Sequence, residues 1–182
     1  MGERTYAVLG MLAPAIAYLA IGASAAASPW FDWWVNALSD LGHSERSGVA
    51  SIFNFGLLLS GFLATLYLFG AMRKHARYTA YCLLSSAFTL QLVAVFDEAY
   101  GPLHLTASWL LFISLGISSL AYLLERRSIL ALASIIIGLG AWIIHWAWGF
   151  PPGPAIPETL SSLAVTSWIV VSAVKIHFSE PS

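Results

Sequence analysis

The stretch SILALASIIIGLGAWIIHWAWGF, residues 128–150, contains no Asp, Glu, Lys or Arg. A helix needs roughly 20 mostly apolar residues to cross about 30 Å of hydrocarbon, and this stretch is long and apolar enough to do so. A strand of a membrane barrel would be about half as long and would alternate in polarity. Residues 128–150 therefore predict a transmembrane helix.

Five further stretches have the same character, at residues 6–27, 48–72, 78–96, 105–124 and 159–176. Of the 182 residues, 59% are hydrophobic and 9% are charged, whereas soluble domains carry about 25% charged residues. The sequence predicts an all-α integral membrane protein, a single domain over residues 1–182 built as a bundle of six transmembrane helices. Eight Lys and Arg against nine Asp and Glu leave no basic excess for phosphate backbones, which excludes nucleic acid as a partner.

The basic residues predict the orientation, because Lys and Arg are retained on the cytoplasmic side during insertion. With the N-terminus inside, seven of the eight lie on that side: Arg4, Arg73, Lys74, Arg77, Arg126, Arg127 and Lys175, leaving Arg46 outside. We expect a multi-pass protein of the cell membrane with both termini cytoplasmic. The small residues 25–28 would also fit a signal-peptide cleavage site, which would leave five helices. The first apolar run exceeds the usual 7–15 residues of a signal peptide, which favours a retained span.

Three connections on the predicted external side hold most of the unusual residues, at 28–47, 97–104 and 151–158. Tryptophans at 30, 33, 34, 142, 146 and 148 predict an aromatic belt at the outer interface. Between the first two spans, residues 30–41 suggest either a short amphipathic helix on the membrane surface or a re-entrant piece between helices. The fold therefore includes an external interfacial or re-entrant segment.

Ionisable side chains at membrane depth are costly and face a partner or a wet cavity, so they are candidates for function. Ser108 follows His104 by one helical turn, and Asn54 lies on a stripe of small and polar residues along the second span. We expect one externally open pocket in which these side chains converge, although each also has a structural interpretation, as a cap or a solvated acid. The candidates are Ser39, Asp40, His43, Asn54, Asp97, His104, Ser108, His145 and Glu158.

The order of short motifs resembles a known family. Ser39-Asp-Leu-Gly42 precedes the second span, Phe53-Asn54 lies within it, His104 leads into the fourth span, and Pro157-Glu158 opens the sixth. This pattern is similar to the uncharacterised six-helix membrane proteins labelled DUF 998, over nearly the whole chain. The resemblance implies the six-helix fold and the interest of Ser39, Asp40, Asn54, His104 and Glu158, and it implies no activity.

The residues leave several functions open. One is a hydrolase-like enzyme acting on a lipid or small amphiphile, with His104, Asp97 and Glu158 as catalytic candidates, unaided or around a divalent metal. The others are a lipid- or small-ligand-binding protein, a membrane scaffold subunit, or a haem protein with His104 and His145 as axial ligands. The ligand-binding candidates are Ser39, Asp40, His43, Asn54, Ser108 and His145. Membrane lipid is the expected partner, and the sequence does not fix the oligomeric state.

Overall fold

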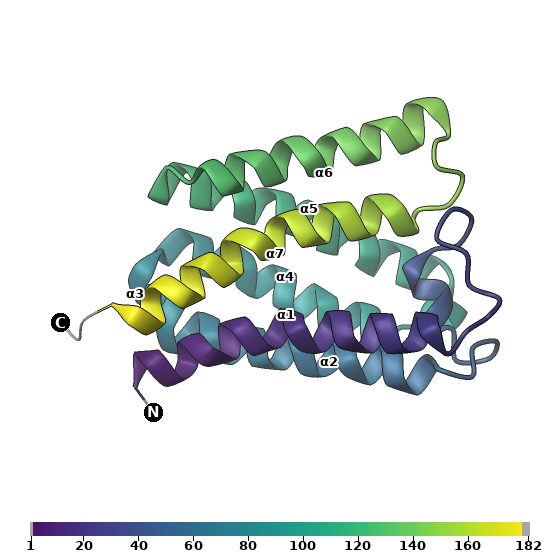
Figure 1. Cartoon of the computed structure of the whole chain (residues 1–182), viewed down its shortest axis with the longest axis horizontal. Coiled ribbons are helices and arrows are strands. Elements are labelled where there is room, and N and C mark those ends of the chain that lie inside the picture. Colours follow the sequence, from purple (N-terminus) through teal and green to yellow (C-terminus); the bar gives the residue numbers. More distant parts are fainter. Residues whose placement is uncertain (1, 180–182) are drawn as a thin grey trace.

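The computed structural model describes residues 2–179 and is a bundle of helices (Figure 1). Within these residues, six helices are long and apolar enough to cross a membrane, which confirms the six-span prediction. Each begins and ends within four residues of its predicted span, the largest shift being from 159 to Ala155. The elements are α1 (Glu3–Ala26), η1 (Leu38–Gly42), α2 (Ala50–Tyr67), η2 (Leu68–Met72), α3 (Arg73–His75), α4 (Arg77–Val95), η3 (Glu98–Tyr100), α5 (Pro102–Arg126), α6 (Ile129–Trp148) and α7 (Ala155–Phe178).

The π-helix η2 joins α2 to α3, so that Ala50–His75 forms one span. Helices α1 and α2 pack together, α2 packs on α4, α4 on α5, and α7 closes the bundle against α1. Helix α6 packs mainly on its neighbours α5 and α7, and it is the least buried of the six spans. Five helices therefore surround the bundle interior, and α6 lies outside them (Figure 1).

The two ends of the bundle differ. At the terminal end, residues 2–5, 73–77, 126–128 and 175–179, both chain ends lie on the same side of the bundle (Figure 1), and Arg4 donates to the Ser179 carbonyl. At the capped end, η1, η3 and the connection 149–154 close the helices. The seven basic residues predicted to be cytoplasmic all belong to the terminal end or to the adjoining helix ends.

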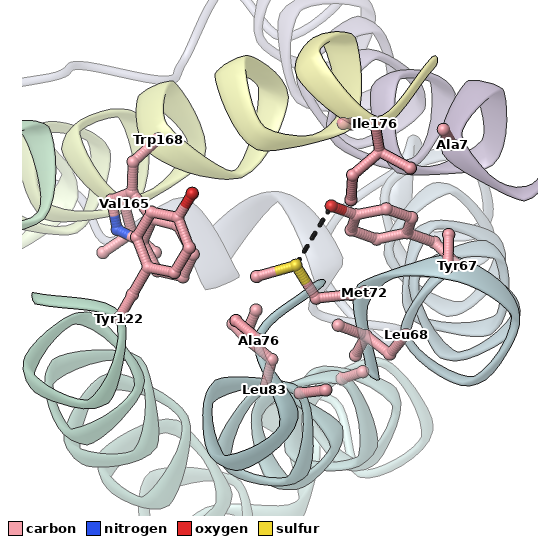
Figure 2. Close-up of a cluster of buried hydrophobic side chains, with 14 of the residues drawn as sticks. Ala7, Tyr67, Leu68, Met72, Ala76, Leu83, Tyr122, Val165, Trp168 and Ile176 are labelled. Carbon is pink, nitrogen blue, oxygen red and sulfur yellow. Dashed lines mark hydrogen bonds between the residues drawn. The ribbon is translucent and has the colours of Figure 1, made fainter. Parts of the chain in front are cut away.

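A buried cluster fills the bundle near the terminal end (Figure 2). The Tyr67 hydroxyl donates to Met72 Sδ at 3.3 Å and lies 3.0 Å from Ser172 Oγ. Trp168 is fully buried, stacks on Tyr122 at 4.4 Å between ring centroids, and donates its indole N–H to Ser119 Oγ. Because lipid offers no hydrogen bonds, these internal pairs keep the polar atoms of an otherwise apolar cluster satisfied.

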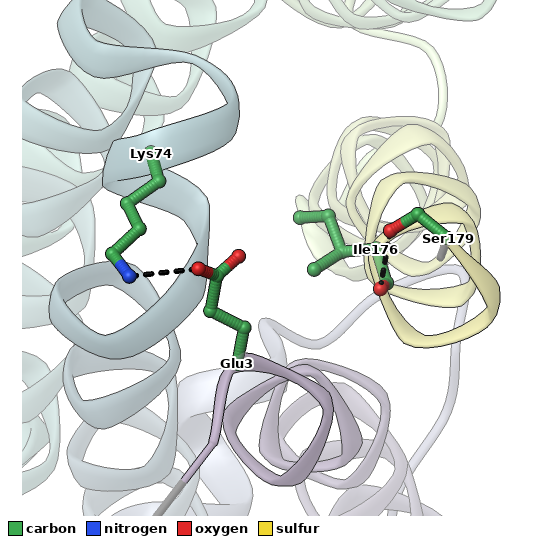
Figure 3. Close-up of polar contacts among 4 residues, drawn as sticks. All are labelled: Glu3, Lys74, Ile176 and Ser179. Carbon is green, nitrogen blue, oxygen red and sulfur yellow. Dashed lines mark hydrogen bonds and ion pairs between the residues drawn. The ribbon is translucent and has the colours of Figure 1, made fainter. Parts of the chain in front are cut away.

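Polar contacts at the terminal end fix helix ends to one another. Lys74 Nζ of α3 lies 2.7 Å from Glu3 Oε1 of α1, while Ser179 Oγ donates to the Ile176 carbonyl in the last turn of α7 (Figure 3). Glu125 of α5 accepts hydrogen bonds from the backbone N–H groups of Tyr78 and Thr79 and from the Thr79 hydroxyl. A carboxylate is favoured at this position, because the first N–H groups of α4 have no partner within their own helix.

The segment between α1 and α2 folds across the capped end. For residues 30–41 the sequence offered a short amphipathic helix or a re-entrant piece; in the structure residues 30–37 form turns and irregular backbone, and Leu38–Gly42 forms a 3₁₀-helix. Asn54 Nδ2 donates to the Gly42 carbonyl at 2.8 Å, and a Cβ at Gly42 would lie 2.8 Å from the Phe53 ring. Glycine is therefore required where η1 meets α2. The connection before α7 adds a second attachment, because Gly153 N donates to the Trp34 carbonyl.

Candidate ligand-binding cavity and its acidic end

A cavity of about 190 Å³ runs inside the bundle, and its walls come from α1, α2, α4, α5 and α7 together with η1 and the start of η2. On α1 the lining residues extend from Gly10 to Ile21, about 16 Å at 1.5 Å per residue. An apolar cavity of about 150 Å³ is large enough to hold benzene. The space therefore suits a small or slender apolar group that lies along the helices.

Several hydroxyl groups in the cavity walls bond to a side chain of a neighbouring helix. Tyr18 Oη lies 3.1 Å from Thr166 Oγ1, which joins α1 to α7. Ser86 Oγ lies 3.3 Å from Ser118 Oγ, which joins α4 to α5. Since these groups already have partners, the middle of the cavity offers few free hydrogen bonds and is chemically apolar.

Glu158 gives the cavity an acidic end. This side chain stands in the first turn of α7, where a carboxylate is stabilised by the helix dipole. Its Oε2 accepts the Leu38 N–H at 2.8 Å, which ties η1 to α7. Ser39 and Ser108 line the same cavity. Among the described lining residues Glu158 is the only carboxylate, and none is Lys, Arg or His, so the polar end of the cavity has acceptor and acidic character.

Asp40 folds back on η1 and does not line the cavity. Its Oδ2 accepts hydrogen bonds from Asn36 Nδ2 and from the Ala37 backbone N–H, both at 2.8 Å. The first N–H groups of a helical turn have no partner within the turn, so a carboxylate that accepts one of them stabilises the turn. Asp40 therefore shapes η1, and through η1 it places Ser39 at the cavity.

Glu98 is not among the candidates that the sequence indicates. It is half-buried in η3, which contacts η1, and its Oε2 is buried without a hydrogen-bond partner among the described residues. Burial, with the neighbouring Asp40 carboxyl adding to it, raises the pKa of Glu98 to about 7, against the opposing effects of Arg46 and the Ser39 hydroxyl. The only sequence signal for Glu98 is that it directly follows Asp97, the residue that caps η3.

His104 and Ser108 form a hydrogen-bonded pair on one face of α5. His104 Nδ1 lies 2.8 Å from the Phe96 carbonyl oxygen, and His104 Nε2 lies 3.3 Å from Ser108 Oγ. In the neutral imidazole, Nδ1–H donates to the carbonyl and Nε2 accepts from the Ser108 hydroxyl. Asp97 instead accepts the Ala99 N–H as the cap of η3. The Phe96 carbonyl therefore orients His104, and Ser108 stands between His104 and the cavity.

The remaining candidates stabilise the connections. His43 is buried and accepts the Glu45 N–H through Nδ1. His145 Nδ1 lies 2.8 Å from the Pro151 carbonyl oxygen, and its ring lies edge-on to Trp142. Neither His43, Asn54 nor His145 lines the cavity. The structure thus brings Ser39, Ser108 and Glu158 to one cavity, and places the other predicted residues around it or apart from it.

Within residues 2–179, no three His, Cys, Asp or Glu side chains lie close enough together to hold a metal ion. His104 and His145, the two haem-ligand candidates, each have Nδ1 beside a backbone carbonyl oxygen, and neither lines the cavity.

The six apolar helices define the class as a multi-pass membrane protein. The family model described as "Protein of unknown function (DUF998)" matches residues 11–175, most of the chain, and the protein belongs to this family. This confirms the resemblance found in the short motifs. No curated protein and no solved structure matches the chain.

Proposed function

We propose that this protein binds an amphiphile, with the alkyl chain inside the bundle and the polar head beside Glu158, Ser39 and Ser108. The observation that carries the proposal is the continuous apolar cavity with a carboxylate at one end. Ligand sites combine mostly apolar walls with a few polar groups that fix orientation. The interior of the bundle has this composition, and its axial extent suits a chain better than a compact solute.

The charge at the capped end limits the head group. Glu158 lines the cavity, and Glu98 and Asp40 lie close enough to interact electrostatically with it. An anionic head would be repelled by these carboxyl groups, whereas an amine or hydroxyl could donate hydrogen bonds to Glu158. We therefore assign the cavity to amphiphiles with cationic or neutral, donor-bearing heads.

The test compares decylamine, decanol and decanoate, three amphiphiles with the same number of carbons, by the thermal unfolding midpoint of the purified protein in a non-ionic detergent. We expect the amine to raise the midpoint most and the alcohol to raise it less, while the carboxylate should leave it unchanged. Glu158→Gln can still accept from Leu38 N–H, and it should remove the advantage of the amine over the alcohol. Glu45→Gln, an exposed acid of the same end, is the matched control. Equal stabilisation by decanoate, or none by any chain, would contradict the proposal.

The His104–Ser108 pair supports a second candidate function, the hydrolysis of an ester of such an amphiphile. A nucleophile hydrogen-bonded to a base that a third group orients is the arrangement that activates serine. His104 Nε2 would take the Ser108 proton as Oγ bonds to the ester carbon. The alcohol would leave with that proton, and water would then release the acid and restore Ser108.

This second function is tested with p-nitrophenyl decanoate and a fluorophosphonate label. Ser108→Ala should abolish both turnover and labelling. Thr106→Ala should change neither, since the Thr106 hydroxyl bonds to the Pro102 carbonyl in its own helix. Absence of labelling in the unchanged protein, or equal labelling of Ser108→Ala, would remove the catalytic function and leave the binding function standing.

We also propose that the protein lies in the cell membrane with its capped end outside. The gathering of seven cations near the terminal end supports this orientation. In a Cys82→Ser background, a membrane-impermeant maleimide added to intact cells should label Ser44→Cys at the capped end and not Arg73→Cys at the terminal end. The reverse pattern would overturn the orientation.

A further inference from the structure

The terminal end holds a second cavity, separate from the first. It measures about 290 Å³ and lies between α5, α6 and α7, with His75 of α3 at its edge. It shares no lining residue with the cavity inside the bundle. Its floor includes the stacked rings of Tyr122 and Trp168, both buried.

Three cations line this basic pocket, Arg126 and Arg127 at the end of α5 and Lys175 in the last turns of α7. All three are exposed, and within residues 2–179 none forms an ion pair with a carboxylate. The nearest acid, Glu125, is engaged by the N-terminus of α4. The pocket therefore gathers three positive charges, and no carboxylate among the described residues pairs with them.

The start of α6 adds to this charge. Ser128, Ile129 and Leu130 line the pocket as the N-cap and first turn of α6, where Ser128 Oγ accepts the Ala131 N–H and leaves the other first N–H groups available. The first N–H groups of a helix have no partner within the helix, and the helix dipole makes that end positive. A helix N-terminus beside cationic side chains, at a cavity, is a favourable place for an anion.

The backbone of Arg127 has a conformation that is unfavourable for a residue with a side chain. Arg127 is the only described non-glycine residue with a positive φ, 49°, and it links α5 directly to α6. A left-handed conformation is unfavourable for a side chain with a Cβ. Glycine would meet the backbone requirement better, so a long cation at this turn is consistent with a role for its charge in the pocket.

The apolar surroundings identify the source of the anion. Ile129, Leu130 and Val171 line the pocket and are exposed, next to the apolar outer faces of spans that would contact lipid chains. Basic pockets between transmembrane helices bind the head groups of anionic lipids. We infer that this pocket binds the phosphate group of an anionic membrane lipid, whose acyl chains lie against the exposed apolar residues beside it.

The test measures binding of phosphatidylglycerol and phosphatidylcholine to the detergent-purified protein by native mass spectrometry. We expect phosphatidylglycerol to bind more tightly, and the double variant Arg126→Gln/Lys175→Gln to lose about 25-fold in affinity, about fivefold for each cation removed. The double variant Arg73→Gln/Arg77→Gln removes two cations of the same end outside the pocket and should keep the affinity within about twofold. Equal losses in the two double variants, or equal binding of the two lipids, would overturn the inference.

Two further experiments distinguish a loss of binding from a loss of folding, and a lipid from a soluble phosphate. Arg127→Gly removes a cation and relieves the positive φ, so its thermal midpoint should not fall while its phosphatidylglycerol affinity drops about fivefold. Glycerol phosphate supplies the phosphate without acyl chains and should not compete at concentrations where phosphatidylglycerol saturates. Competition at equal concentration would assign the pocket to a soluble phosphate and overturn the lipid assignment.

Discussion

The capped end and the terminal end of the bundle have opposite charge. Glu158, Glu98 and Asp40 come from three separate elements at the capped end, whereas Arg126, Arg127 and Lys175 surround a pocket at the terminal end. The net charge of the chain is only −1, so composition conceals this separation. The bundle therefore carries two pockets of different chemistry, one apolar with an acidic side chain at its end and one lined by three cations.

The largest expected change in stability comes from the buried side chains beneath the basic pocket. Trp168→Ala should lower stability by about 3–5 kcal/mol, because it removes a fully buried indole, its stacking on Tyr122 and its bond to Ser119. Thermal unfolding in detergent, followed by circular dichroism, measures the change. Trp148→Ala, an indole 73% exposed on α6, is the control and should change little. Comparable losses in the two variants would mean that the terminal end is not the packed region described here.

The next effect is a pH dependence at the capped end. The pKa of Glu98 is raised from 4.5 to about 7, so the folded protein holds this proton more tightly than the unfolded chain. Stability should therefore be fully present below about pH 4.5 and should fall as the pH rises to about 7. The loss is on the order of 2 kcal/mol, since partial exposure screens the interaction.

The measurement is the thermal midpoint across this pH window, for the unchanged protein and for Glu98→Gln. Glutamine stays neutral over the whole range, so the variant should lose this part of the pH dependence and be the more stable protein at pH 8. Glu45→Gln controls for removal of an acid in the same region. If the Glu98→Gln curve ran parallel to that of the unchanged protein, the burial of this acid would play no part in the difference between the ends.

A smaller effect is expected at the contact between η1 and α2. Asn54→Ala should cost about 1 kcal/mol through loss of the bond to the Gly42 carbonyl. It should leave amphiphile binding unchanged, because Asn54 does not line the cavity. Ser51→Ala, exposed on the same helix, is the control. A selective loss of decylamine affinity without loss of stability would instead make Asn54 part of the binding site.

The smallest effect belongs to the exposed pair Lys74–Glu3, whose side chains are 63% and 44% exposed. Lys74→Ala should lower stability by less than about 1 kcal/mol, and high salt should remove the difference. Unfolding midpoints at low and high ionic strength test this. A large loss of stability that did not depend on salt would mean that the cations of the terminal end are needed for folding. It would speak against their being free to bind lipid.

The sequence predicted the six spans and singled out three residues that line the cavity, Ser39, Ser108 and Glu158, because both leave local signals. Span lengths follow from bilayer thickness, and Glu158 was found because an acid after proline at a helix start is visible in the chain. Asp97 was placed beside His104 as an acid, yet the structure gives His104 the Phe96 carbonyl, and Asp97 caps η3. Side-chain partners depend on the path of the backbone in a connection, which hydrophobic periodicity does not report.

The two cavities lay beyond sequence reasoning for a related reason. The cavity inside the bundle is lined by residues such as Gly10, Ala17 and Ser60, which look like ordinary packing positions until five helices are assembled. The basic residues were recognised as markers of orientation, while their gathering around the start of α6 requires α5 and α7 to be placed side by side with it. Convergence of distant segments is a property of the fold.

Native mass spectrometry after mild detergent purification would detect an amphiphile held in the cavity inside the bundle. Ala17 lines the cavity and Ala15, two residues away on α1, is exposed outside it, so Ala17→Phe and Ala15→Phe add the same ring to opposite sides of one helix. We expect one decylamine bound per chain on the unchanged protein and on Ala15→Phe. On Ala17→Phe the affinity for decylamine should fall at least tenfold. Equal retention by all three proteins would contradict the proposal.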